Sequence, residues 1–148
     1  MTWNVYLSGE IHTDWREQIQ NGTKNAELDI EFFGPVTHHE MSDDVGEEIF
    51  GKEERKFWRD HKAAKINGVR IRKGIQDADL VVVRFGEKFK QWNAAFDAGY
   101  AHALGIPIVT IHDDDLIHPL KEIDSVAQAT AQSPKQIVQL FKYLVEAS

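Results

Sequence analysis

The sequence of 148 residues contains no cysteine, which excludes disulfides, thiolate nucleophiles and zinc sites built on cysteine. It also contains no run of basic residues. Lys and Arg total 17 against 24 Asp and Glu, which gives a net charge of −7. A chain with this balance lacks the positive surface that binds duplex nucleic acid or an anionic membrane. A pocket for a single nucleotide remains compatible with it.

Several sequence motifs are also missing. The chain has neither the G-x-G-x-x-G nor the Walker A phosphate loop, and it has no G-x-S-x-G elbow. Dinucleotide oxidoreduction, ATP hydrolysis and serine esterase chemistry are therefore unsupported, and we expect no cofactor. Because no signal peptide and no apolar stretch long enough to span a membrane is recognisable, we expect a cytoplasmic protein.

Strand-like and helix-like segments alternate along the chain. Apolar runs predict strands at residues 5–9, 28–33, 80–83 and 108–111, with a short edge strand at 127–130. Helical patterns follow Asp14, span residues 53–75 and 89–103, and begin again after Ser133. We therefore expect one α/β domain over residues 1–148, a flavodoxin-like three-layer sandwich with a five-stranded parallel sheet of order 2-1-3-4-5.

Three local interpretations accompany this fold. Residues 37–51 are polar with few apolar anchors, and we interpret them as a long loop with about one turn of helix. The pair Asn21-Gly22 is expected to end the first helix. Gly68 lies on the apolar stripe of the long helix, where it would allow close approach to the sheet.

In such a sheet, ligands bind beyond the carboxyl ends of the strands, here between the loops after the first and third strands. Glu10 follows the first strand, and Asp97 lies on the helix after the third in an apolar setting. Two carboxylates are the minimal set for glycosidic cleavage. The alternatives are that Asp97 only satisfies a backbone N–H and that Glu10 caps a helix or faces solvent.

Aromatic and histidine side chains add further candidates, each with more than one interpretation. Trp92 would stack on a planar base or belong to the core, and His12 would contact the ligand, act as an acid or face solvent. Potential metal ligands occur in two groups, but neither has a helical His-x-x-x-His pair. These groups are His38, His39 and Asp43, and His112, Asp113 and His118. We expect no native metal; a hydrolase using a metal at the first group is the weakest alternative.

Four segments resemble the YtoQ family: residues 6–12 (YLSGEIH), 34–35 (GP), 85–93 (FGEKFKQWN) and 118–122 (HPLKE). The chain is also more distantly similar to nucleoside 2-deoxyribosyltransferases and their nucleotide N-glycosidase relatives. Their nucleophile lies in a Glu-x-Gly-Tyr-Ala segment, which here begins at Asp97. The resemblance therefore implies their fold and places Asp97 at the nucleophile position.

With Asp97 as the nucleophile, the expected crevice suggests roles for the surrounding residues. Glu10 or His12 would be the acid/base, and Trp92 or Phe85 would support the base. The remaining substrate-binding candidates comprise sugar contacts and crevice residues: Tyr6, Ser8, Gly9, Asn67, Gly86, Gln91 and Asn93.

The chain departs from the transferases at three places. Asp97 is one methylene shorter than their Glu, and Gln91 stands where they have a sugar-binding Asp. Arg70 and Arg72 lie near the place of another acid, where they would bind a phosphate or simply face outward.

We therefore expect an N-glycosidase or glycosyl transferase acting on a nucleoside-like or nucleotide-like small molecule. The alternative is a non-catalytic nucleotide-binding or sensing module on the same fold. The relatives form oligomers, and the chain has aromatic residues near its expected surface, namely Trp15, Phe50, Phe57 and Trp58. These features predict a homodimer or higher homo-oligomer.

Overall fold

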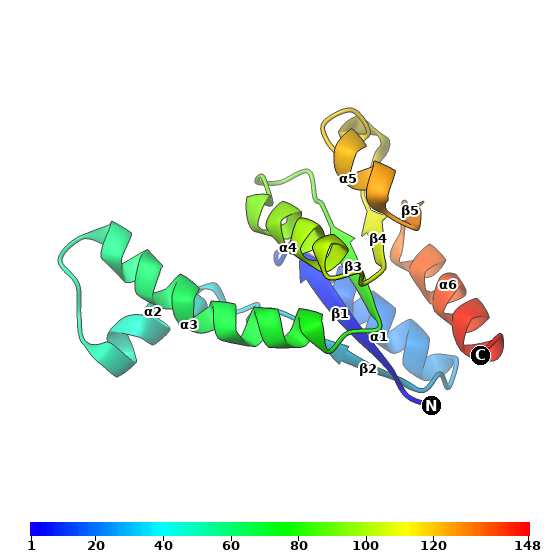
Figure 1. The fold of residues 1–148 in the computed structure, drawn as a ribbon, viewed down its shortest axis with the longest axis horizontal. Coiled ribbons are helices and arrows are strands. Elements are labelled where there is room, and N and C mark those ends of the chain that lie inside the picture. The colour runs from blue at the N-terminus through cyan, green and yellow to red at the C-terminus, as the bar shows by residue number, and fades with distance from the viewer.

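The computed structural model describes all of residues 1–148 except the side chain of His39. Its centre is a parallel sheet of five strands in the order β2-β1-β3-β4-β5, as predicted (Figure 1). The strands are β1 (Trp3–Gly9), β2 (Ile30–Phe33), β3 (Leu80–Arg84), β4 (Ile108–Ile111) and β5 (Ala129–Ala131). The α/β class and the strand order are therefore confirmed.

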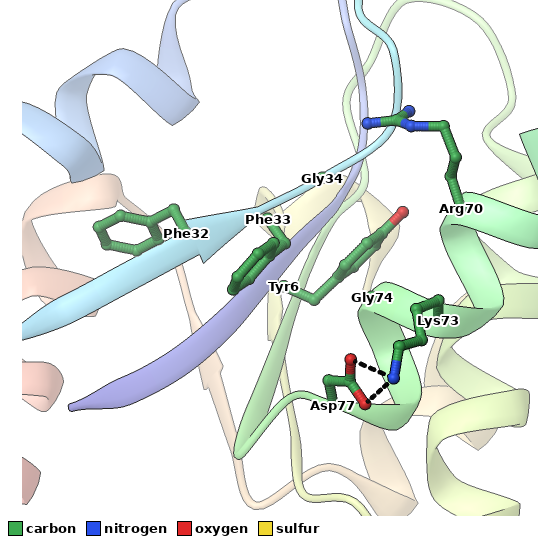
Figure 2. A pocket seen from close by; sticks show the side chains of 8 residues that line it. All are labelled: Tyr6, Phe32, Phe33, Gly34, Arg70, Lys73, Gly74 and Asp77. Atoms are coloured by element: carbon green, nitrogen blue, oxygen red, sulfur yellow. Dashed lines mark hydrogen bonds and ion pairs between the residues drawn. The ribbon is translucent and has the colours of Figure 1, made fainter. Parts of the chain in front are cut away.

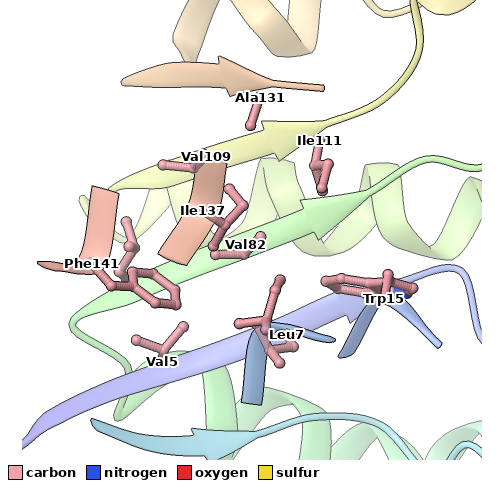
Figure 3. Close-up of a cluster of buried hydrophobic side chains, with 11 residues drawn as sticks. Val5, Leu7, Trp15, Val82, Val109, Ile111, Ala131, Ile137 and Phe141 are labelled. Atoms are coloured by element: carbon pink, nitrogen blue, oxygen red, sulfur yellow. The ribbon is translucent and has the colours of Figure 1, made fainter. Parts of the chain in front are cut away.

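Helices cover both faces of this sheet. On one face lie α1 (Trp15–Asn25) and α6 (Pro134–Glu146), which enclose the cluster drawn in Figure 3. On the other lie α3 (Lys56–Gln76), α4 (Trp92–Ala103) and the short α5 (Lys121–Val126). A 3₁₀ turn (Asp114–Leu116) precedes α5. None of the described helices is long and apolar enough to cross a membrane.

Alternation along β1 decides which side chains reach which layer. Val5 and Leu7 belong to the cluster beneath α1 and α6, whereas Tyr6 faces the α3 and α4 layer. Ser8 therefore faces the same layer as Tyr6, because successive side chains on a strand point to opposite faces. All of Leu80–Val83 in β3 is buried, as expected of a central strand covered on both faces.

The prediction of a loop over residues 37–51 is wrong, because residues 39–50 form α2 (His39–Phe50). This helix packs on α3 and forms with it a hairpin that extends away from the sheet (Figure 1). Polar contacts join the two helices: Arg59 pairs with Asp44 and, at 2.8 Å, with Glu47. A helix that is held by polar contacts needs few apolar residues, so its sequence pattern resembles that of a loop.

Two glycine interpretations also need correction. Helix α1 continues past Gly22 to Asn25, and an added Cβ at Gly22 would lie 2.8 Å from Val138 of α6. Gly68 has nothing within 4 Å of its Cβ position, so it makes no close approach to the sheet. That contact occurs instead at Gly74, where a Cβ would lie 2.7 Å from the ring of Tyr6.

Two aromatic side chains of α4 point outward. Trp92 and Phe96 are 75% and 64% exposed, whereas the face that packs on the sheet consists of Ala94, Asp97, Ala98 and Ala101. Trp15, which we expected near the surface, is buried in the core beneath α1. Small residues on α4 bring its backbone close to the sheet, and this places Asp97 against β1.

Candidate functional site

A buried carboxylate lies beside the carboxyl end of β1. Ser8 Oγ donates a hydrogen bond of 2.7 Å to Asp97 Oδ2, and Asp97 is 8% exposed. Burial raises the pKa of Asp97 to about 6, although the bond from Ser8 favours its ionised form. A carboxylate with so little compensation for its burial is a candidate for chemistry rather than a simple structural anchor.

Tyr6 lies two residues before Ser8 and faces the same helices. Its side chain is 1% exposed, and its hydroxyl has no hydrogen-bond partner among the described residues. Burial and the negative charge of Asp97 raise the pKa of Tyr6, whereas the charges of Arg16 and Arg70 act in the opposite direction. The phenol therefore keeps its proton at neutral pH and offers an unused hydrogen-bond donor.

Glu10 organises the loop that follows β1. Its carboxylate accepts hydrogen bonds from the N–H groups of His12 and, at 2.7 Å, of Thr13, and it lies 3.8 Å from Arg84 Nε. Burial alone would raise the pKa of Glu10, but these bonds and the charge of Arg84 outweigh it and lower the pKa. The ionised side chain of Glu10 therefore fixes the conformation of its own loop.

The loop after β3 meets the loop after β1 at His12. The His12 ring is exposed and lies 4.9 Å, centre to centre, from the ring of Phe89. Gln91 holds the same loop internally, because its amide accepts from Gly86 N at 2.9 Å and donates to the carbonyl of Phe89 at 2.7 Å. The structure therefore brings His12 to the expected crevice but uses Gln91 to shape the loop.

The other predicted site residues divide into exposed, buried and structural positions. Trp92 and Asn93 are exposed on the first turn of α4. Phe85 is 5% exposed and belongs to the core cluster. Asn67 donates to the Ser42 carbonyl at 3.0 Å and so ties α3 to α2.

Two glycines allow the strand ends to approach one another. Gly9 has φ of +115°, and a Cβ there would lie 2.1 Å from the carbonyl oxygen of Arg84. A Cβ on Gly86 would lie 2.8 Å from Glu10 Cγ. Both positions are needed for the close packing of the crevice floor, whether or not a ligand touches them.

A pocket of about 330 Å³ adjoins this region between β1, β2 and α3 (Figure 2). Tyr6 and Phe33 supply its aromatic wall, and Arg70 and Lys73 supply its positive charges. A second pocket of about 510 Å³ lies on the α1 side of β2 and includes Arg16 in its lining. The guanidinium of Arg16 is occupied there, because it donates to the carbonyls of Leu7, Gly9 and Glu10.

Among the residues whose side chains the structure describes, no three potential metal ligands form a cluster. In the first group, the side chain of His39 lies outside the described residues. In the second, His112 is buried and its ring nitrogens contact the Asp113 carbonyl and Asp124 Oδ2, each at 2.8 Å. Both nitrogens are thus already engaged by the protein.

Sequence reasoning missed the bond between Ser8 and Asp97 and the unpaired hydroxyl of Tyr6. The alternation of β1 does place Tyr6 and Ser8 on one face, and this was an available signal. What the sequence does not show is that α4 packs over that face with Asp97 inward. Burial of Arg84 Nε without a hydrogen-bond partner is likewise visible only in the fold.

Comparison with solved structures relates this architecture to two proteins. A conserved protein from Enterococcus faecalis V583 matches with a TM-score of 0.65 and 14% identity, over 97% of this chain and 99% of that chain. A 2-deoxyribosyltransferase from Bacillus psychrosaccharolyticus matches with a TM-score of 0.51 and 17% identity, over 90% of this chain and 89% of that chain. At these identities the matches show a shared fold.

Sequence comparison gives a closer relationship. A family model described as nucleoside 2-deoxyribosyltransferase YtoQ matches residues 6–145. The YtoQ protein of Bacillus subtilis strain 168 is 44% identical over 146 residues, which cover 99% of both chains. Since both matches span nearly the whole sequence, the protein belongs to the family described as nucleoside 2-deoxyribosyltransferase YtoQ.

Proposed function

We propose that the protein is an N-glycosidase or glycosyl transferase that acts on a nucleoside-like or nucleotide-like small molecule. The observation that carries the proposal is the buried carboxylate of Asp97, which has Ser8 as its hydrogen-bond donor and a pKa raised to about 6. Membership of a family named for nucleoside 2-deoxyribosyltransferases supports the substrate class. A buried carboxylate with a perturbed pKa beside a crevice is typical of a functional site, and in retaining glycoside cleavage one ionised carboxylate serves as the nucleophile.

The proposed reaction uses Asp97 as the nucleophile. One carboxylate oxygen attacks the anomeric carbon of the sugar, the carbon–nitrogen bond breaks, and its electron pair leaves with the base. A proton delivered to the base nitrogen completes its release. Water then attacks the glycosyl ester in a hydrolase, or a second base does so in a transferase, and the Asp97 carboxylate is regenerated.

Of the two acid/base candidates, His12 suits the proton transfer better than Glu10. The ring of His12 is exposed beside the loop after β3, whereas the carboxylate of Glu10 is occupied by Thr13 and by the His12 N–H. Hydrogen bonds that lower the pKa of Glu10 make it a poor proton donor at neutral pH. We assign Glu10 as a positioning residue for the loop that carries His12.

A binding or sensing module is the second candidate function. It is favoured by the amides of Gln91 and Asn67, which bond to the protein itself instead of remaining free for sugar hydroxyls. Such a module would use the same crevice for a nucleotide but would release no base.

Incubation of the protein with nucleosides and nucleoside monophosphates, followed by chromatography for free base, tests the proposal. The glycosidase or transferase function predicts base release that increases with time and is lost in Asp97→Asn. Transferase assays include a second free base as acceptor. Ligand-dependent thermal stabilisation without base release in either assay supports the binding module instead.

We also propose that the protein works as a homodimer. Large apolar side chains are exposed along the α2–α3 hairpin, which projects from the body in Figure 1. They are Met41, Ile49, Phe50, Phe57 and Trp58. A second copy is a suitable occupant, because a two-fold interface would place this surface against its own counterpart or against the exposed Trp92 and Phe96 of α4.

A further inference from the structure

We propose that the pocket between β1, β2 and α3 binds the phosphate of a phosphorylated substrate, with the Tyr6 hydroxyl and the Arg70 guanidinium as its donors. The inference depends on the proposed glycosidase function for one point, the identity of the ligand as a nucleotide. The binding of an anion rests on the pocket alone.

The first donor is a buried hydroxyl that the protein does not use. Tyr6 is 1% exposed, and its oxygen has no hydrogen-bond partner among the described residues. Leaving such a group unpaired is unfavourable, and a ligand oxygen would satisfy it. Figure 2 shows that this hydroxyl lies at the end of the pocket nearest Arg70.

The second donor is the cation of Arg70. Lys73, one turn further along α3, pairs with Asp77 at 2.9 Å, so its charge is already balanced. Arg70 makes no hydrogen bond or ion pair with any residue that the structure describes. In a chain of net charge −7, an unpaired guanidinium at the mouth of a pocket is an attractive site for an anion. The planar fork of arginine also matches two phosphate oxygens.

The walls of the pocket are aromatic and closely packed. Tyr6 and Phe33 are register partners in neighbouring strands, and their rings line the pocket. Gly74 allows α3 to lie directly against the Tyr6 ring, because a Cβ there would be 2.7 Å from Tyr6 Cε2. A volume of about 330 Å³ is at the lower end of the range for small-ligand pockets and suits the phosphorylated end of a mononucleotide.

Tyr6 also connects this pocket with the proposed nucleophile. Ser8, the hydrogen-bond donor to Asp97, is two residues further along the same face of β1. The charges of Asp97 and Arg70 both act on the pKa of Tyr6, so both groups lie near its phenol. A phosphorylated sugar would therefore extend past Tyr6, with its anomeric carbon toward Asp97 and its phosphate toward Arg70.

Calorimetric titration of the Asp97→Asn protein tests this arrangement without turnover. The probes are deoxyribonucleoside 5′-monophosphates and their parent nucleosides. The proposal predicts that a monophosphate binds at least about tenfold more tightly than its nucleoside, the usual gain from a charge-assisted contact. Adding Arg70→Ala or Tyr6→Phe should reduce that ratio toward one while changing nucleoside affinity by less than about twofold.

Arg72→Ala is the matched control, because Arg72 is an exposed arginine on the same helix that does not line the pocket. It should keep the full preference for the monophosphate. Equal affinity for the two probes, absence of binding by either, or an equal loss in the two arginine variants would overturn the proposal. A thermal melt of each variant confirms that it is folded.

The outcomes separate this inference from the proposed function. Binding of monophosphates that depends on Arg70, with no base release by the wild-type protein, would retain the phosphate site and reject the glycosidase. Base release from nucleosides and monophosphates at equal efficiency, with no effect of Arg70→Ala, would retain the glycosidase and reject the phosphate site.

Discussion

Asp97 combines two properties that a purely structural residue would rarely need. Its carboxylate is buried on the face of α4 that packs on the sheet, and its one described hydrogen bond comes from Ser8. The hydroxyl of Tyr6, on the same face of β1, has no hydrogen-bond partner among the side chains that the structure describes. Donors and acceptors that remain unused inside a close-packed layer are best explained by a ligand that completes them.

The raised pKa of Asp97 gives a stability prediction with a definite sign. A native pKa of about 6 against an ordinary value of 3.8 means that the folded protein binds this proton more tightly than the unfolded chain. The stabilising contribution is therefore complete below pH 3.8 and is lost as the pH rises through about 6. Asp97→Asn, which is nearly isosteric and uncharged, should increase the free energy of unfolding at pH 7.5 by about 1–3 kcal/mol.

Urea unfolding of both proteins at pH 7.5 and pH 4 measures this effect. The gain should disappear at the lower pH, and Asp115→Asn, at an exposed position, serves as the control. A loss of stability in Asp97→Asn at both pH values would instead identify Asp97 as a structural anchor.

The sequence identifies some of the candidate site residues by their type, but it does not identify the residues that they contact. Glu10 is recognisable as a candidate because it follows the first expected strand, and Asp97 because it is a carboxylate in an apolar setting on the helix after the third. The bond from Ser8 to Asp97 joins residues 89 positions apart, so it depends on how α4 packs across β1. The partners of Gln91 and Asn67 are equally hidden in the sequence, because an amide that can bind a sugar hydroxyl can also bind a backbone carbonyl.

Among the elements, the strands were predicted better than the polar helices. Residues 80–83 and 108–111 form a continuous apolar signal because central parallel strands are buried on both faces. Helix α2 has no such signal, since it packs mainly on α3 and is held by Arg59 and Asn67. Helix α2 lies close to α3 at Gly46, where a Cβ would be 2.5 Å from Lys62 Cβ.

Two glycine substitutions in the hairpin should therefore have opposite effects. Gly46→Ala forces α2 and α3 apart, and we expect it to lower the free energy of unfolding by about 1 kcal/mol or more. Gly68→Ala meets nothing within 4 Å and should raise it by up to about 1 kcal/mol through helix propensity. Urea unfolding monitored by circular dichroism compares them, and the same sign for both would contradict the described packing of the hairpin.

At the scale of the whole molecule, the doubly wound sheet follows from the alternation of strands and helices, and its order is the predicted one. What the alternation does not indicate is the hairpin that projects from the sheet (Figure 1). Its exposed Phe57 and Trp58 contact each other at 4.9 Å between ring centres and have no covering layer in the described chain. The proposed second copy would supply that layer.

Light scattering coupled to size-exclusion chromatography tests the assembly. We expect the mass of a dimer, twice 16.9 kDa, or more at micromolar concentration. Trp58→Glu should shift the protein toward the monomer, because it places a charge in the proposed apolar interface. Tyr143→Glu, at an exposed aromatic on α6, is the control and should leave the mass unchanged. A wild-type monomer would refute the dimer.

The most direct test of Asp97 as the nucleophile is mass spectrometry of the peptide that contains it. The protein is first incubated with a slow, 2′-fluorinated nucleoside or its monophosphate. Fluorine slows both formation and breakdown of the glycosyl ester, so the covalent intermediate accumulates when a good leaving base is present. The account predicts a fluorinated sugar on Asp97, with one equivalent of free base released and no adduct in Asp97→Asn. Turnover of the unmodified substrate by Asp97→Asn at the wild-type rate, with no adduct on the wild-type peptide, would contradict it.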